Sequence, residues 1–318
     1  MNISMVHYSH QEFILLGFPS FYESQHLLFI PFFLIYVVIL VANIIIIHTV
    51  LMESSLHAPM YVLISLLSAV NICGTTTIVP KMLLGFLSYQ NHISLVGCLT
   101  QMFFIYFIIM MDCNILLMMA LDRYIAICKP LHYSNIMTKH NLFLLTIVAV
   151  VRGVSFVCPV IYLASRVDFC HSNIIHHFAC EHMALLSLAC GTITKNKLVG
   201  LCLRVFSMLF DMSFLCTSYG SIMSVALTIS GAARHKSLHT CGTHILVILI
   251  VYFFRLSSSI VYRVSRSVSQ DTHNLLSAIY LLIPALVNPL IYGLRTTEIR
   301  IRILKVFCQI NIGLHFMS

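Results

Sequence analysis

The sequence predicts an all-α membrane protein, a seven-transmembrane helix bundle followed by a short C-terminal interfacial helix. Seven apolar stretches occur in series, each at least as long as the roughly 20 residues that a helix needs to cross hydrocarbon. The composition agrees, because 59% hydrophobic and 9% charged residues leave too few polar side chains to coat a globule. The connections are mostly short, and no Pro/Gly/Ser-rich linker interrupts the series.

The chain is expected to form one integral domain. Its seven predicted spans are Leu27–Val50, Ala58–Pro80, Leu95–Met118, Leu142–Ala164, Leu198–Ile229, Thr243–Tyr262 and Leu275–Leu294. Residues 1–26 form an N-terminal segment, residues 27–294 the seven-span domain and residues 295–318 a tail. The N-terminal segment shows no basic region followed by an apolar core and a cleavage site, so the first span is expected to direct insertion.

Basic residues predict which ends of the spans face the cytoplasm. With the N-terminus outside, nine Lys and Arg fall in cytoplasmic segments and five in outer loops, as the positive-inside rule requires. Asn2-Ile3-Ser4 is the only N-x-Ser/Thr sequon, and an outside N-terminus would allow glycosylation at Asn2. We therefore expect a multi-pass plasma-membrane protein with an extracellular N-terminus.

Four cysteines are expected to face an oxidising compartment. Cys98 lies at the outer end of the third span, and Cys170, Cys180 and Cys190 lie in the loop after the fourth. Four thiols allow three pairings. We favour Cys98–Cys180, which joins the loop to the third span, with Cys170–Cys190 closing the loop on itself.

The same loop is rich in potential metal ligands, which are His171, His176, His177, Glu181 and His182. Copper or zinc binding is the alternative reading. Disulfide formation would consume the thiols, and the histidine spacing matches no closed tetrahedral pattern. We therefore expect a disulfide-bonded lid and no metal or cofactor.

Five motifs, in order along the chain, resemble the signatures of the odorant (olfactory) receptor family. They are PMYVLISLLSAVN at Pro59–Asn71, MALDRYIAIC at Met119–Cys128, SYGSI at Ser218–Ile222, RHKSLHTCGTH at Arg234–His244 and PALVNPLIYGLR at Pro284–Arg295. The loop CEHMALLSLAC at Cys180–Cys190 is similar to the fish-like, class I branch. The motifs cover the chain nearly end to end.

The resemblance implies a class A (rhodopsin-like) G protein-coupled receptor. Such a receptor binds a small odorant and activates a stimulatory olfactory-type G protein, which raises cyclic AMP. It implies a location in the cilia of olfactory neurons, with membrane lipid, a heterotrimeric G protein and a trafficking chaperone as partners. It implies no enzymatic activity and no nucleic-acid binding.

The residues expected to couple to the G protein are Asp122, Arg123, Tyr124, Tyr219, Asn288, Pro289 and Tyr292. Arg123 can reach the cytosol from the inner end of the third span and is expected to pair with Asp122. The two tyrosines Tyr219 and Tyr292 can hydrogen-bond across a cleft that opens when the sixth span moves. Pro289 breaks the helical hydrogen-bond ladder and predicts a hinge. The alternative is a snorkelling arginine with interfacial tyrosines.

Asp112 lies in mid-membrane, where an ionisable residue costs roughly 2.5–3.5 kcal/mol and needs a partner or a proton. We expect a polar relay in which Asp112 bonds to Asn71 and Asn288. The chain departs from the family pattern here, since Asn71 replaces an acid and Asp112 a glutamate. Sodium binding is therefore in doubt, and a protonated Asp112 is an equal alternative.

Ligand recognition is expected beneath the lid. The third span contributes an apolar and aromatic wall, and the sixth a basic, hydroxyl-bearing stripe. The predicted ligand-binding residues are Met102, Ile105, Tyr106, Ile109, Met110, Arg204, Tyr252, Arg255, Ser259, Tyr262 and Arg263.

Charge favours a particular ligand class. Arg255 lies within the membrane, with Asp211 as an expected counter-ion for which Arg204 competes. We expect a carboxylic acid or other polar odorant anchored by Arg263 or Arg255. The rival is a neutral ligand held by Ser259 and Tyr262.

Other functional classes fit less well. A transporter should show internal repeats or broken half-helices, and an intramembrane enzyme should show paired acids or a His-rich metal site within spans. The sequence shows neither, so a non-sensory class A receptor for another small ligand is the alternative. The tail from Thr296 to Cys308 is expected to lie on the lipid surface, with Cys308 a palmitoylation candidate.

Overall fold

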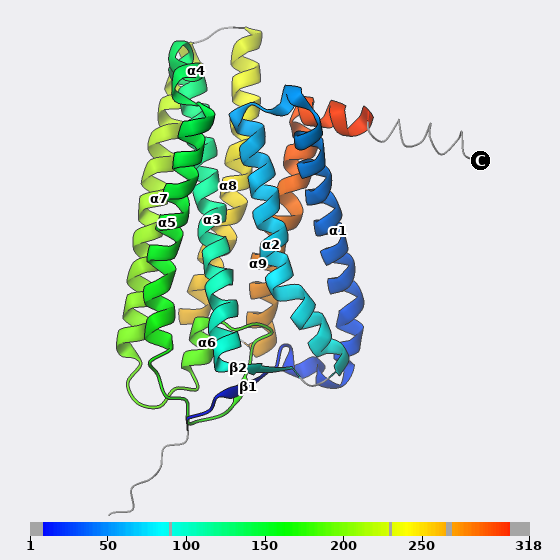
Figure 1. Cartoon of the computed structure of the whole chain (residues 1–318), viewed down its shortest axis with the longest axis vertical. Helices are drawn as coiled ribbons and strands as arrows, with labels where there is room; N and C mark the ends of the chain where they lie inside the picture. The colour runs from blue at the N-terminus through cyan, green and yellow to red at the C-terminus, as the bar shows by residue number, and fades with distance from the viewer. Residues whose placement is uncertain (1–8, 89–90, 229–230, 265–268, 306–318) are drawn as a thin grey trace, which may run out of the picture.

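The computed structural model describes residues 9–88, 91–228, 231–264 and 269–305; the side chains of residues 232, 233, 236, 237, 239, 240 and 258–264 lie outside this description. Seven long helices form a bundle (Figure 1). They are α1 (Gln25–Met52), α2 (Pro59–Ser88), α3 (Leu95–Cys128), α5 (Lys139–Ala164), α7 (Thr194–Thr228), α8 (Ala232–Val264) and α9 (Gln270–Arg295).

The seven helices match the seven predicted spans in order and extend past most of their predicted bounds. Six segments of the described chain are long and apolar enough to cross a membrane, and α8 carries a shorter apolar stretch, Cys241–Ser257. The outward faces are apolar as well, with Leu27, Val148 and Phe206 each more than 60% exposed. Lipid contact explains such a surface, because water would not tolerate a continuous apolar patch of this size.

Several helices begin at a side-chain cap. The Ser94 hydroxyl accepts a hydrogen bond from the Gly97 amide (3.1 Å), and Thr138 accepts one from Asn141 (3.2 Å). Ser269 accepts one from Thr272 (3.3 Å). These bonds satisfy amides that the first turn of a helix leaves free, and they fix where α3, α5 and α9 start.

One end of the bundle, here called the lid end, is covered by the long loop 165–193, which includes the short helix α6 (His182–Leu186). A three-stranded sheet of order β2-β1-β3 lies there, built from β1 (Glu12–Leu15), β2 (His92–Ser94) and β3 (Ile174–Ile175). β1 pairs antiparallel with β2 and parallel with β3. The all-α prediction is confirmed for the bundle, and the small sheet is an addition formed by segments that were expected to be loops.

The opposite end, here called the tail end, carries α4 (Tyr133–Ile136) and a helix over residues 297–305 (Figure 1). Short 3-10 helices complete the connections, namely η1 (Pro19–Ser24), η2 (Ser54–Leu56) and η3 (Pro130–His132). The 297–305 helix crosses the bundle end beside α1, with Ile299 fully buried and Arg302 paired to Glu53 (3.1 Å). It covers most of the interfacial helix predicted for the tail; Cys308 lies outside the described residues.

The core divides into an inner cluster and two clusters nearer the lid. The inner cluster joins α2, α3 and α8 through residues such as Leu63, Leu116 and Val247. The lid cluster packs Phe13 of β1 edge-on against Phe169 (centroids 5.4 Å apart). The N-terminal segment is therefore an integral layer of the lid.

Candidate functional site

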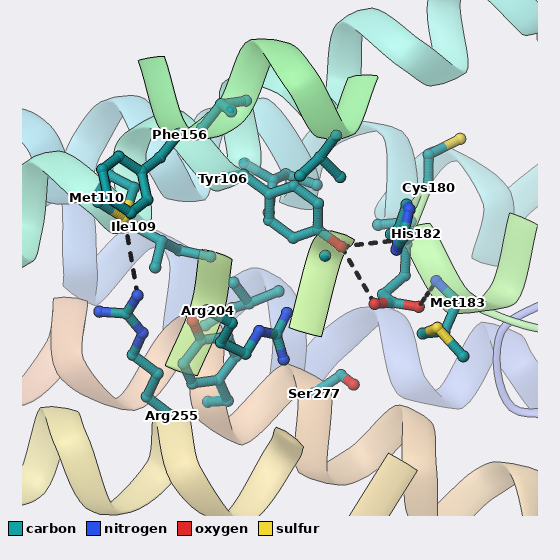
Figure 2. Close-up of a pocket in the computed structure, with 18 of the residues that line it drawn as sticks. Tyr106, Ile109, Met110, Phe156, Cys180, His182, Met183, Arg204, Arg255 and Ser277 are labelled. Carbon is teal, nitrogen blue, oxygen red and sulfur yellow. Dashed lines mark hydrogen bonds between the residues drawn. The ribbon is translucent and has the colours of Figure 1, made fainter. Parts of the chain in front are cut away.

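A cavity of about 130 Å³ lies beneath the lid, between α3, α5, α7, α8 and α9 (Figure 2). It is here called the upper cavity. Its walls are mainly apolar, and its polar side chains come from the lid, α3, α7, α8 and α9. The lining residues that matter below are Ile105, Tyr106, Ile109, Met110, Phe156, His177, Glu181, Arg204, Ser207, Arg255, Ser277 and Tyr280.

Six of the predicted ligand-binding residues line this cavity, namely Ile105, Tyr106, Ile109, Met110, Arg204 and Arg255. Met102 does not: it is fully buried in the lid cluster, one turn of α3 closer to the disulfide. Tyr252 is buried too, and its hydroxyl bonds to Asp211 rather than facing the cavity. The side chains of Ser259, Tyr262 and Arg263 lie outside the part that the structure describes.

The lid is fixed to α3 covalently and by hydrogen bonds. Both expected disulfides are formed, Cys98–Cys180 (Cα atoms 5.3 Å apart) and Cys170–Cys190 (5.6 Å). The Gln101 side chain accepts a hydrogen bond from the Cys180 amide (3.0 Å). The position of the lid relative to α3 is therefore fixed by a covalent bond and a hydrogen bond.

Glu181 and Tyr106 connect the roof to the cavity wall. The Tyr106 hydroxyl donates to Oε1 of Glu181 (3.1 Å) and accepts from the His182 amide (3.1 Å), as the dashed lines in Figure 2 show. The other Glu181 oxygen accepts from the amides of Met183 (2.6 Å) and Ala184 (2.9 Å) at the start of α6. The only acid lining the upper cavity among the described residues is thus already saturated with donors.

His177 lies on the inner face of the lid and is 2% exposed. Its Nδ1 lies 2.8 Å from the Ala179 carbonyl oxygen, to which a protonated Nδ1 donates, and 3.1 Å from the Ala179 amide nitrogen, from which an unprotonated Nδ1 accepts; its Nε2 has no partner in the described chain. Burial lowers the pKa of His177 below its ordinary value of 6.5, although Glu181 nearby acts in the opposite direction. At neutral pH the ring is therefore uncharged.

The loop that was considered for metal binding brings Cys170, His171 and Cys190 together, with their ligand atoms within 4.8 Å of one another. The two thiols are joined to each other, so they cannot supply thiolate ligands. This arrangement agrees with the expected disulfide-bonded lid.

Two arginines give the cavity its charge. Arg204 of α7 lines the cavity and makes no ion pair with an acid of the described chain. Arg255 of α8 is 7% exposed, and its guanidinium contacts two sulfur atoms, Sγ of Cys113 (2.7 Å) and Sδ of Met110 (3.7 Å). Sulfur is a weak acceptor, so both guanidiniums retain donors for a ligand.

Asp211, the expected counter-ion of Arg255, pairs more closely with a residue that the sequence interpretation left without a role. Arg152 of α5 reaches Asp211 at 2.5 Å, whereas Arg255 lies 3.8 Å away. Tyr252 donates to the same carboxylate (3.0 Å), and Arg152 also donates to Asn114 (2.5 Å). The expected competition from Arg204 is not seen. An arginine inside a predicted span was the signal available for Arg152.

Close approach of α5 to α3 makes this network possible. Gly153 sits beside Phe107, and a Cβ at that position would come within 3.0 Å of the Phe107 ring. The neighbouring Arg152 bonds both to Asn114 of α3 and to Asp211 of α7. Phe210 of α7 covers the guanidinium with its ring, 4.9 Å from the centroid, which shields the pair from lipid.

A second, smaller space of about 60 Å³, here called the lower cavity, lies deeper in the bundle. Its polar lining consists of Asn71, Thr75, Asp112, Cys113, Arg255 and Tyr280. The expected Asn71–Asp112–Asn288 hydrogen bonds are not formed among the described residues. Asn71 donates instead to Asn43 of α1 (3.1 Å), while Oδ1 of Asp112 and both polar atoms of Asn288 are buried without a partner.

The tail end holds the predicted coupling residues. Arg123 donates to Asp122 through Nε (2.9 Å), as expected, and Tyr133 of α4 donates to the other carboxylate oxygen (2.7 Å). Burial and the bond to Asp122 raise the pKa of Tyr133, so its hydroxyl remains a donor at neutral pH. Tyr124 is half-buried at the same end of α3. The role of Tyr133 was not predicted.

His244 of α8 lies between the two predicted tyrosines and was also missed. The Tyr219 hydroxyl hydrogen-bonds to Nδ1 of His244, and the Tyr292 ring lies 6.3 Å from the His244 ring. The Tyr292 hydroxyl is buried with no partner in the described chain, and Pro289 lies inside the continuous helix α9 one turn away. The two tyrosines therefore do not contact each other in this structure.

Comparisons with known proteins agree with this architecture. Residues 32–310 match the family model described as olfactory receptor. The chain is 36% identical to human olfactory receptor 52K1 over 94% of its own length and 96% of that protein's. It is 39% identical to human olfactory receptor 52P1, covering 93% of this chain and 92% of that one.

A further relative is human olfactory receptor 51E2, with 37% identity over 96% of both chains. Among solved structures, a crystal structure of squid rhodopsin superposes with a TM-score of 0.71 at 14% identity, covering 91% of this chain and 87% of that one. This second likeness concerns the fold, which is that of a rhodopsin-like G protein-coupled receptor.

Proposed function

Because the chain belongs to the olfactory receptor family, we propose that it binds a small odorant in the upper cavity and activates a stimulatory olfactory-type G protein. The observation that supports this most directly is the mainly apolar upper cavity beneath a disulfide-fixed lid. A cavity of this kind suits small, largely apolar molecules with one polar group. The protein is a multi-pass membrane receptor and not an enzyme.

The proposal places the lid end outside the cell and the tail end in the cytoplasm. The disulfides support this orientation, since such bonds persist in oxidising compartments. So does the excess of basic residues in the segments at the tail end. We further propose that the receptor resides in the plasma membrane of olfactory cilia after chaperone-assisted trafficking, with glycosylation at Asn2, which lies outside the described residues.

The coupling surface would lie at the tail end. Arg123 is restrained there by Asp122, which Tyr133 also binds. Tyr219 is restrained by His244. Outward movement of α8 would break the bond between Tyr219 and His244 and free Tyr219 to turn towards Arg123. The proposal is that odorant binding favours this rearrangement by changing the contacts of α8 at Arg255.

A carboxylic acid is the proposed ligand class. Arg204 and Arg255 both present guanidinium donors to the upper cavity, and neither is saturated by a carboxylate. A carboxylate fits a guanidinium in bidentate geometry, and each charge-assisted contact contributes about 1.5–3 kcal/mol. The competing ligand is a neutral odorant held by hydroxyl groups, for which Ser207, Ser277 and Tyr280 are placed in the same cavity.

The experiment compares cyclic AMP responses to a series of aliphatic acids and their methyl esters in cells expressing the receptor. We expect the acids to be more potent, and Arg204→Gln and Arg255→Gln each to reduce acid potency by about 10- to 100-fold. Arg263→Ala is tested beside them. Arg166→Gln, at an exposed loop arginine stacked on Tyr162, serves as the matched control.

Surface staining of each variant separates binding from expression. Unchanged acid potency in all three arginine variants would contradict acid anchoring while leaving a receptor for neutral odorants intact. Cyclic AMP responses that persist in cells lacking the stimulatory G protein would contradict the coupling proposal.

A further inference from the structure

The upper and lower cavities share part of their walls. Residues common to both linings are Ile105, Ile109, Arg255, Tyr280 and Leu281. Among these, Arg255 is the one with a formal charge, and Tyr280 is the one other polar side chain. A ligand anchored on Arg255 therefore reaches the boundary between the two spaces.

The lower cavity contains an acceptor that the protein leaves unused. Oδ1 of Asp112 is buried and has no hydrogen-bond partner in the described chain, and Asp112 lines the cavity. The neighbour expected to satisfy it, Asn71, is committed to Asn43. Buried polar atoms almost always have a partner, so an orphaned carboxylate oxygen beside an open space indicates a guest that donates a hydrogen bond.

Arg255 has the opposite deficit: its guanidinium has hydrogen-bond donors without strong acceptors. Its described contacts are two sulfur atoms, and the nearest carboxylate, Asp211, lies 3.8 Å away and is already bonded by Arg152 and Tyr252. The lower cavity thus combines a guanidinium with free donors and a carboxylate oxygen with a free acceptor site. A guest that offers both a carboxylate and a nearby donor would satisfy the two together.

We propose that the receptor is selective for 2-hydroxy carboxylic acids bound head-down, with the carboxylate on Arg255 and the 2-hydroxyl on Oδ1 of Asp112. This rests on the proposed odorant-receptor function. The lower cavity, at about 60 Å³, has room for a few water-sized groups. It holds the polar head, and the alkyl chain extends upward along Ile105, Ile109 and Phe156 towards the lid.

A hydroxyl suits the site better than an ammonium group. Burying an ammonium ion costs far more desolvation free energy than burying a hydroxyl. A hydroxyl both donates and accepts, so it can bond to Asp112 whether the carboxyl group is ionised or protonated. Attachment to the carbon next to the carboxylate keeps the two polar groups within the small lower cavity, whereas a hydroxyl further along the chain would lie in the apolar upper cavity.

The test uses hexanoic, 2-hydroxyhexanoic, 2-methoxyhexanoic and 4-hydroxyhexanoic acids in cyclic AMP dose–response assays on the full-length receptor. We expect 2-hydroxyhexanoic acid to be about tenfold more potent than hexanoic acid, as one additional hydrogen bond to a charged group predicts. The 2-methoxy acid has no hydroxyl donor, and the hydroxyl of the 4-hydroxy acid lies too far from the carboxylate to reach Asp112. Both should therefore be no more potent than hexanoic acid. Equal potency of hexanoic and 2-hydroxyhexanoic acids would overturn the proposal.

Two variants locate the effect. Asp112→Leu should reduce the potency ratio of 2-hydroxyhexanoic to hexanoic acid, both measured on the same variant, from about tenfold to about one. Asp168→Asn, at an exposed loop acid, is the matched control. A tenfold preference that survives Asp112→Leu would refute the role of Asp112.

The ligand series on the unmodified receptor keeps the proposal testable if Asp112→Leu does not reach the cell surface. The same series separates this inference from the proposed function. If hexanoic acid activates the receptor and the hydroxyl adds nothing, the odorant-receptor function stands and the head-down site fails. If neutral odorants activate it and no acid does, acid anchoring and the head-down site fail together.

Discussion

The cavity region and the tail end of the same bundle differ in whether their charged side chains are paired within the protein. Around the two cavities, Arg204 has no described acidic partner, Arg255 rests against sulfur and Asp112 keeps an orphaned oxygen. At the tail end the one buried charged group, Asp122, is bonded by both Arg123 and Tyr133, and the Tyr219 hydroxyl is bonded to His244; the Tyr292 hydroxyl is the exception, with no partner in the described chain. Charged groups without a partner around a cavity indicate a binding site for a ligand. The paired groups at the tail end, Asp122 with Arg123 and Tyr133, indicate a latch, a set of bonds that activation must break.

Between the two regions lies the Arg152–Asp211–Tyr252 network, and its removal should have the largest effect. Asp211→Asn would leave the Arg152 guanidinium in the bundle without its carboxylate, and breaking a buried ion pair in this way costs about 3–5 kcal/mol. We expect a severe loss of surface receptor and of thermal stability in detergent. Both are measurable by flow cytometry and a thermal-shift assay, with Asp168→Asn as the control. Normal stability of Asp211→Asn would show that the network carries little of the packing.

The lid contact at Tyr106 comes next. Tyr106→Phe removes the hydroxyl that joins Glu181 to the His182 amide, a loss of about 1.5–3 kcal/mol for bonds to a charged group. Odorant potency should fall by about tenfold, and amide exchange in residues 180–186 should accelerate. Tyr162→Phe, at an exposed tyrosine, should change neither. Unaltered exchange in Tyr106→Phe would mean that the disulfide alone fixes the roof.

A smaller effect is expected at the latch. Tyr133→Phe removes one of the donors to Asp122 and leaves the Arg123 pair in place, so the closed form should lose about 1 kcal/mol. Basal cyclic AMP should rise roughly fivefold, as that free energy predicts. His132→Asn, at the exposed neighbouring residue, is the control. Basal activity at or below that of the unmodified receptor would contradict the assignment of Tyr133 to the latch.

The smallest expected effect concerns pH at the lid. Burial lowers the pKa of His177 in the folded lid below the 6.5 of an exposed histidine. The unfolded lid therefore takes up a proton first as the pH falls below 6.5, and the folded lid loses stability until its own His177 protonates. Lid amide exchange, corrected for intrinsic rates, should be faster at pH 5.5 than at pH 7.4. His177→Gln should flatten this dependence, and equal slopes in both proteins would rule out His177 as its source.

Much of the fold could be predicted because a helix that crosses a membrane must be a long apolar stretch, which is visible in the sequence. The seven spans follow from apolar length, and the tail helix from its amphipathic pattern. Both disulfides match the pairing that was favoured among the three that Cys98 at a span end and three cysteines in the following loop allowed. The three strands were missed because segments of two to four residues in loops carry almost no periodic signal, and they pair only with segments distant in the sequence.

The site was less predictable because the sequence pattern of a helix shows which residues share one face but not which neighbouring helix packs against that face. Arg255 and Asp211 were rightly placed within the bundle, yet Arg152 from α5 is the closer partner of Asp211. Asn71 was expected to hydrogen-bond to Asp112, but its side chain donates to Asn43 of α1 instead. Met102 shares a face with Ile105 and Ile109 but lies too near the disulfide to reach the cavity. Each error concerns depth or neighbour, which only the packed bundle determines.

The position of β1 between β2 and β3 has a consequence for biosynthesis. Residues 12–15 are synthesised before their parallel partner, Ile174–Ile175, and the four long helices α1, α2, α3 and α5 lie between the two segments in the chain. The sheet at the lid end can therefore be completed only after β3 has been made, and β1 lacks its parallel partner until then. Leader peptides or epitope tags fused close to Glu12 would compete with this closure, so a spacer before residue 9 should improve maturation of the receptor.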